Sequence, residues 1–250
     1  IVIYNVTAMR AFSLSVGIDY SPLWGNYSWG HKWNVLFLEN DKPLHFERKK
    51  DTLSVGFDSF DRRPAKIFRE TFGRQDINFT DLKEDVPENL LDNHRIDVTH
   101  EYTKVSNINV PLRYSPISKK RYSVICTFNN KNWVSQDWGK IKKKQAYFKN
   151  MGTGILYLAM YYDNGSLKPA SDPFILMEDG QVTFLVPTMT KTQNMQLTRK
   201  FPCSNNIQAY CDNMSNGNFQ GANNADFRDS VSLFTITKSP EKIETALITN

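Results

Sequence analysis

The sequence has few cysteines, which limits the covalent and metal chemistry that it can support. Only three occur in 250 residues, too few for a disulfide framework. Cys203 and Cys211 are close enough in sequence to close a small loop in an oxidising compartment. Cys126 lies in a segment that alternates like a strand, so we expect a buried, unreactive thiol there. No spacing resembles a zinc site, and we predict neither a metal nor a cofactor.

Long hydrophobic runs are also missing. No apolar stretch approaches the ~20 residues that span a bilayer, so we predict no transmembrane segment. The chain starts without methionine, at Ile1, inside a predicted helix. We therefore expect that an upstream segment has been cut away, and the lack of a signal peptide carries no information.

The chain also lacks a large excess of charge of one sign, since its formal net charge is only +5. The one basic cluster runs from Lys140 to Lys144. It is open to two interpretations, a patch for nucleic acid or anionic glycan, and a solvated hairpin or strand edge on which lysines discourage pairing. No groove-reading motif accompanies it, so we favour the second and predict no nucleic-acid partner.

Apolar and aromatic residues, by contrast, are plentiful. Hydrophobic residues make up 40% of the chain and aromatic residues 13%, which is typical of a globular protein rich in β-structure. Apolar spacing predicts a helix over 1–16 and strands over 18–20, 31–38 and 44–47. Residues 57–97 are charged and irregular, and fit either a docking segment with a linker or a long surface loop.

From about residue 96 the pattern changes to short strands separated by turns. We predict strands at 109–114, 122–128, 144–148, 154–162, 173–177 and 181–186. The turn tripeptides 163–165 and 178–180 are of the kind that joins hairpins. These features predict a β-sandwich domain over 96–200. Residues 201–250 then begin a further β module, and 217–227 resemble the entry to a discoidin-like sandwich.

Several short motifs near the start of the chain resemble one enzyme family. Ala8–Ala11, Gly17–Tyr20, Trp24–Asn26 and Gly30–Asn34 resemble the transglutaminase-like family of papain-type cysteine enzymes, and its secreted bacterial branch most of all. The resemblance covers about the first 50 residues. It implies that 1–95 is the C-terminal part of a transglutaminase-like domain plus a linker. The predicted fold class is therefore α+β, a helix with an antiparallel sheet followed by an all-β sandwich.

The resemblance also implies site residues. A cysteine enzyme needs an imidazole beside its thiolate and a third group that orients the imidazole. His31, at the start of a strand, would be the general base, with its ring against the helix that opens the chain. Glu47, or as a second candidate Asp51, would be the orienting group.

The tryptophans and the other histidines complete the candidate list. Trp24, Trp29 and Trp33 would line a substrate cleft, or else serve as packing residues. The remaining histidines have no partner pattern, and we predict surface or structural roles for His45, His94 and His100.

The nucleophile itself is missing from the expected place. No cysteine precedes His31, and Ser13 and Thr7 lie on the wrong turn of the helix to replace one. The resemblance implies a cysteine a few residues upstream of Ile1, so residues 1–250 alone should be inert.

Two functional hypotheses follow. The first is an extracytoplasmic enzyme that, in its intact form, hydrolyses or transfers at an amide bond of a protein or peptide substrate. The second is a non-catalytic cell-surface protein with a degenerate scaffold, in which the β modules bind carbohydrate or protein.

Overall fold

A computed structural model describes the chain except for residues 28, 39–42, 50–51, 56–61, 130–131, 187–192, 199–214, 225–226, 238–242 and 249–250. The chain divides into two compact units, Ile1–Leu185 and Val186–Asn250. Among the described residues, no helix is long and apolar enough to cross a membrane.

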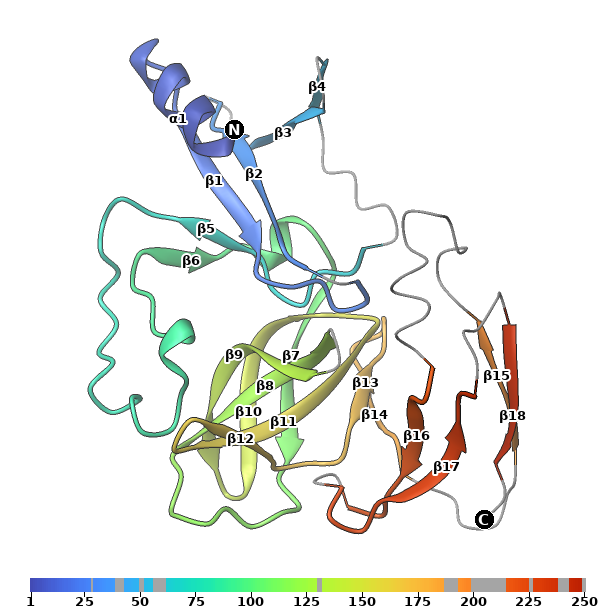
Figure 1. Ribbon diagram of the computed structural model, residues 1–250. Coiled ribbons are helices and arrows are strands. Elements are labelled where there is room, and N and C mark those ends of the chain that lie inside the picture. Colours follow the sequence, from blue (N-terminus) through green and yellow to red (C-terminus); the bar gives the residue numbers. More distant parts are fainter. Residues whose placement is uncertain are drawn as a thin grey trace. The chain divides into compact units, whose positions relative to one another are not determined.

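The first unit begins with the helix α1 (Val2–Ala11) and a six-stranded antiparallel sheet (Figure 1). The order across this sheet is β4-β3-β2-β1-β5-β6. Its strands are β1 (Val16–Ser21), β2 (His31–Leu36), β3 (Leu44–Lys49), β4 (Thr52–Val55), β5 (Phe68–Glu70) and β6 (Arg95–Asp97). Two short 3-10 helices, η1 (Glu88–Leu90) and η2 (Thr99–Glu101), flank β6.

The second sheet of this unit is built from residues 105–184. Its order is β14-β13-β11-β8-β9-β10-β7, and β12 pairs with β11 beside this path. The strands are β7 (Val105–Pro111), β8 (Tyr122–Asn129), β9 (Asn132–Lys142), β10 (Gln145–Gly152), β11 (Ile155–Asp163), β12 (Ser166–Pro169), β13 (Phe174–Leu176) and β14 (Val182–Phe184). Asn164 and Gly165 both have positive φ in the turn between β11 and β12, as a two-residue hairpin requires.

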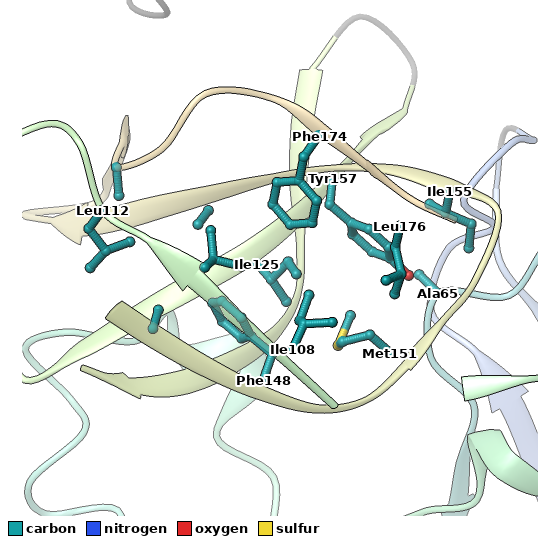
Figure 2. Packing of buried hydrophobic residues seen from close by; sticks show 14 of the residues in the cluster. Ala65, Ile108, Leu112, Ile125, Phe148, Met151, Ile155, Tyr157, Phe174 and Leu176 are labelled. Atoms are coloured by element: carbon teal, nitrogen blue, oxygen red, sulfur yellow. The ribbon is translucent and has the colours of Figure 1, made fainter. Parts of the chain in front are cut away.

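The second sheet curls so far that its two edges approach each other. A Cβ atom on Gly180, after β13, would lie 3.0 Å from the hydroxyl oxygen of Ser106 on β7. Figure 2 shows that side chains from β7, β8, β10, β11 and β13 fill the enclosed space, among them Phe148, Tyr157 and Phe174. The result is close to a barrel, because twisted antiparallel strands close on themselves as their number grows.

The two sheets of the first unit are joined by close contacts. Ala65 belongs to the core of the second sheet, and a Cβ atom on Gly152 would lie 2.0 Å from the carbonyl oxygen of Pro64. Asn129, at the end of β8, donates from Nδ2 to the carbonyl oxygens of Trp24 (3.3 Å) and Tyr27 (2.7 Å). The loop before β2 is thus held by the second sheet.

The predicted α+β fold class is wrong. Among the described residues, strands far outnumber helices, and α1 is the single α-helix described, so the protein is mostly β. The expected linker over 57–97 contributes β5 and β6 to the first sheet, and the expected sandwich is one curled antiparallel sheet. The helix is also shorter than expected, since it ends at Ala11 and Ser13 then takes a positive φ.

The second unit contains two described strand pairs. They are β15 (Gln193–Thr198) with β18 (Ile243–Ile248), and β16 (Asn218–Gly221) with β17 (Val231–Thr235). Cys203 and Cys211 lie outside the described residues, so a bond between them stays a prediction. The discoidin-like resemblance and the boundaries at 95 and 200 stay predictions as well.

Candidate functional site

The first sheet has two faces, and the pairing of its strands assigns each side chain to one of them. Side chains alternate along a strand, and directly paired residues share a face. Asp19 pairs with Trp33, and Val35 pairs with His45. His31 and Glu47, two residues from Trp33 and His45, therefore share their face. We call this the imidazole face.

The opposite side of the sheet is the helix face, because α1 packs against it. Val6 of α1 is buried with Val16, Ile18 and Phe46. The side chain of Asn34 also points this way, and its Nδ2 donates to the carbonyl oxygen of Val2 at 3.1 Å. The helix therefore covers the face that does not carry His31.

The surroundings of His31 follow from this arrangement. The expected position against α1 is wrong, because His31 and Asn34 lie three positions apart on one strand and so point to opposite faces. Nε2 of His31 contacts a carboxylate oxygen of Glu47, the orienting group that the resemblance implies. Asp51, the second candidate, lies outside the described residues. His31 and Glu47 are both partly exposed, at 38% and 30% of their side-chain surface.

The Glu47 contact determines what His31 can do. A carboxylate only accepts hydrogen bonds, so Nε2 of His31 must carry the proton that it shares with Glu47. In the neutral ring, Nδ1 then holds the lone pair. An imidazole held this way can accept a proton at Nδ1, as a general base does.

Two of the three candidate tryptophans are buried in a ring stack. Trp24 is 2% exposed and Trp33 is 1% exposed, and their rings lie parallel with centroids 6.3 Å apart. His31 stacks on Trp33 at 5.9 Å. Trp29 is 75% exposed, so of the three it alone offers a broad surface to a substrate.

A buried hydrogen-bond network, which we did not predict from the sequence, lies beside this stack. Asp19 is fully buried and accepts from Nε and Nη2 of Arg69, both at 2.8 Å. The hydroxyl of Tyr102 donates to Asp19 at 2.5 Å and accepts from the indole N–H of Trp33 at 2.9 Å. Nδ1 of His45 lies 2.5 Å from the same hydroxyl.

The proton count in this network fixes the state of His45. A phenol hydroxyl has one proton, and Tyr102 gives it to Asp19. Nδ1 of His45 must then be the donor to Tyr102, which leaves a lone pair on Nε2 in the neutral ring. Among the described residues, Nε2 of His45 has no hydrogen-bond partner. A second imidazole on this face thus presents a lone pair, which the sequence did not predict.

Burial shifts the pKa values of the network. Burial lowers the pKa of His45, although Asp19 and Glu101 oppose this, so the neutral ring is favoured. Burial and the neighbouring Asp19 raise the pKa of Tyr102 far above its usual range. Burial alone would lower the pKa of Arg69, but Asp19 and Glu101 raise it, and the guanidinium stays charged.

The loop that leads into His31 is tightly constrained. A Cβ atom on Gly30 would lie 2.1 Å from the carbonyl oxygen of Pro22, so only glycine fits. Trp29 has φ 72°, a costly conformation for a large side chain. The sharp turn at Trp29 and Gly30 sets where β2 begins, and with it the position of His31.

The described residues contain no reactive thiol. Cys126 is fully buried in β8, and burial raises its pKa well above the usual range, so the thiol is unreactive at neutral pH. No group of three potential metal-binding side chains occurs in the described part of the chain.

Comparisons with known proteins add no relative to this picture. No protein-family model matches the chain, no curated protein matches it, and no solved structure matches its fold. The resemblance to transglutaminase-like enzymes therefore rests on the short motifs of the first 50 residues alone.

Proposed function

We propose that the imidazole face is an acid–base site of the transglutaminase-like type, with His31 as general base and Glu47 as its positioning residue. The contact between Nε2 of His31 and the Glu47 carboxylate carries this proposal. It orients the ring and leaves Nδ1 able to accept a proton. The substrate class would be a protein or peptide amide, in an extracytoplasmic setting.

The chemistry would proceed in two balanced halves. Nδ1 of His31 accepts a thiol proton, the sulfur attacks the amide carbon, and the imidazolium returns the proton to the leaving amine. Water, or a second amine, then gives His31 a proton and attacks the acyl–sulfur bond. The product is a carboxylic acid or a new amide, and the thiol regains its proton from His31.

The position of α1 constrains where this thiol can come from. The helix covers the face opposite His31, so a side chain on its described turns cannot reach Nδ1. The hydroxyl of Thr7, for example, bonds to the carbonyl oxygen of Ile3 within the helix. The nucleophile therefore has to approach from the imidazole face.

Labelling of the full-length protein tests the proposal. Iodoacetamide reacts with thiolates, so a thiol activated by His31 should label rapidly at neutral pH. We expect His31→Ala to slow the labelling by about 100-fold, the scale of a general base, and Glu47→Ala to slow it less. His94 is exposed and directly precedes β6, which β1 and β5 separate from β2 in the sheet, so His94→Ala is the matched control and should label like the wild type. Equal labelling of all four proteins would refute the proposal.

A second function is favoured by the placement of α1 and by the burial of Trp24 and Trp33. A scaffold that keeps the His31–Glu47 pair, but has its helix on the other face and its aromatic cleft filled, fits a non-catalytic binding protein. In that case the labelling rate does not depend on His31, and the ligand binds elsewhere on the chain.

A further inference from the structure

A cavity of about 450 Å³ lies where the edge of the first sheet, β5 and β6, meets the outer surface of β9 and β10. This volume is in the range of small-molecule sites, about 300–1,000 Å³. None of its lining residues belongs to the imidazole face. We call it the β9–β10 pocket.

The base of the pocket is a fixed ionic group. Lys66 has 1% of its side chain exposed, and its Nζ lies 2.6 Å from Asp97 and 2.8 Å from Asp137. It also donates to the carbonyl oxygen of Lys149 at 2.7 Å. Asp137 uses only one oxygen, Oδ2, in this group, and among the described residues Oδ1 has no donor. An acceptor is therefore available to a ligand hydroxyl.

The wall formed by β9 and β10 alternates aromatic and cationic side chains. Tyr147 pairs with Lys140 across the two strands, and Trp138 and Lys149 continue the same outer face. Tyr147 is 38% exposed. Within the part of the chain that the structure describes, neither ammonium has an ion-pair partner. The indole N–H and the phenol hydroxyl likewise have no hydrogen-bond partner there.

A third cation stands on the opposite wall. The guanidinium of Arg95 lies over the ring of Phe68, 4.0 Å from its centroid, and donates to the carbonyl oxygen of Leu90 at 2.9 Å. These contacts fix its position but leave its charge without a carboxylate partner among the described residues. Arg95, Lys140 and Lys149 thus line the pocket together with the carboxylate of Asp92, and with the Lys66 group included the lining carries a small excess of positive charge.

We infer that the β9–β10 pocket binds a carboxylated sugar unit of an acidic oligosaccharide. Such a ring offers a flat apolar surface to Trp138 and Tyr147, a carboxylate to the lysines, and hydroxyl donors to Asp137. The match between hydroxyl donors and Asp137 distinguishes a sugar unit from phosphate, which only accepts hydrogen bonds and which the Asp137 carboxylate would repel. The inference is independent of the proposed acid–base site.

The sequence interpretation of the lysine cluster changes accordingly. The cluster does form a hairpin, with Lys143 and Lys144 in the turn and both at positive φ. It is not at a sheet edge, since β10 lies between β9 and β7. Lys140 points into the pocket wall, whereas the turn lysines do not line it.

Calorimetric titration of the full chain tests the inference. The probes are trigalacturonic acid, its methyl ester, maltotriose and tetraglutamate. We expect trigalacturonic acid to bind at least tenfold more tightly than the ester, which keeps the ring and hydroxyls but loses the charge. Its affinity should fall as salt screens the charges. Tetraglutamate, with charge but no sugar ring, should not bind.

Matched variants locate the site. We expect Lys140→Met and Lys149→Met each to weaken binding of trigalacturonic acid about tenfold, the scale of one charged hydrogen bond. Tyr147→Ala should weaken it while Tyr147→Phe does so less. Lys143→Met removes one charge outside the pocket and should bind like the wild type. Thermal unfolding of each variant controls for folding.

Three results would overturn the inference. The first is equal binding of the acid and its ester, or no binding of the acid. The second is equal or tighter binding of tetraglutamate, which would indicate an acidic peptide site. The third is a loss of affinity in Lys143→Met as large as that in Lys140→Met, which would indicate general attraction by positive charge and not a specific site.

Discussion

Replacing Lys66 with methionine should destabilise the first unit by about 3 kcal/mol. Methionine keeps most of the apolar stem but removes the charge that lies between Asp97 and Asp137. Breaking a buried ion pair on one side costs roughly 3–5 kcal/mol, because the other charge is left without compensation. We take the lower end because the two aspartates keep 24% and 19% of their side-chain surface exposed.

Urea unfolding followed by tryptophan fluorescence measures this change for the right part of the chain. All five tryptophans precede residue 185, so the signal reports the first unit alone. Lys32→Met is the matched control. It removes a lysine 2.6 Å from Glu70, but 57% of the Lys32 side chain is exposed, and such surface pairs contribute about 0–1 kcal/mol.

The pH dependence gives the same prediction a second test. Burial alone would lower the pKa of Lys66, but Asp137 and Asp97 raise it above its usual 10.5. A raised folded pKa means that the charged form stabilises the fold below pH 10.5, and that this contribution disappears as the pH rises through the folded value. The gap between wild type and Lys66→Met should thus be constant from pH 7 to 10 and shrink above. A gap below 1 kcal/mol at pH 7, equal to that of Lys32→Met, would refute the buried ionic group.

Three further perturbations have clear expected outcomes. Burial lowers the pKa of His45, so the fold should lose stability as the pH falls below 6.5, where the unfolded chain binds the proton more readily. Urea unfolding at pH 7.5 and 5.5 measures this loss, which should be smaller in His45→Gln than in the wild type. Gly30→Ala places a Cβ atom against the Pro22 carbonyl oxygen, so the midpoint of thermal unfolding should fall, and an unchanged midpoint would contradict the tight turn. Replacing Lys143 and Lys144 with Asn-Gly should stabilise the β9–β10 hairpin by about 1 kcal/mol, because both positions need positive φ, which Asn-Gly adopts readily and which costs most other residues about 1–3 kcal/mol. A destabilised double variant would argue against that turn.

The sequence predicted local structure better than global structure. Strands at 122–128 and 154–162 agree closely with β8 (Tyr122–Asn129) and β11 (Ile155–Asp163), because alternation and turn residues are local signals. The role of β5 was missed because its pairing of Arg69 with Asp19 joins residues 50 apart. No local pattern encodes such a pair, and the error in fold class follows from it.

The candidate site, like the fold, was predicted only where its residues lie close together in the sequence. Glu47 was named, with Asp51 as the second candidate, because the family resemblance implies an acidic group on the strand that follows His31. His45, two residues away on the same face, has Tyr102 as its partner, 57 residues further along the chain. The alternation of His45 and Glu47 on one strand was the available signal, since it places both on the face of His31.

The face of the helix was missed for a different reason. A strand start near a helix does not by itself say which way its first side chain points. Only the packing of α1 over Asn34, three positions from His31 on the same strand, shows that the helix covers the face opposite His31.

The protonation of His31 tests the central claim most directly. Nitrogen-15 NMR of the imidazole at neutral pH distinguishes a proton on Nε2 from one on Nδ1. The Glu47 contact predicts that the neutral ring carries its proton on Nε2 in the wild type, and that Glu47→Ala shifts the ring towards a mixture of both forms. A proton on Nδ1 in the wild type, or the same spectrum in both proteins, would contradict the account.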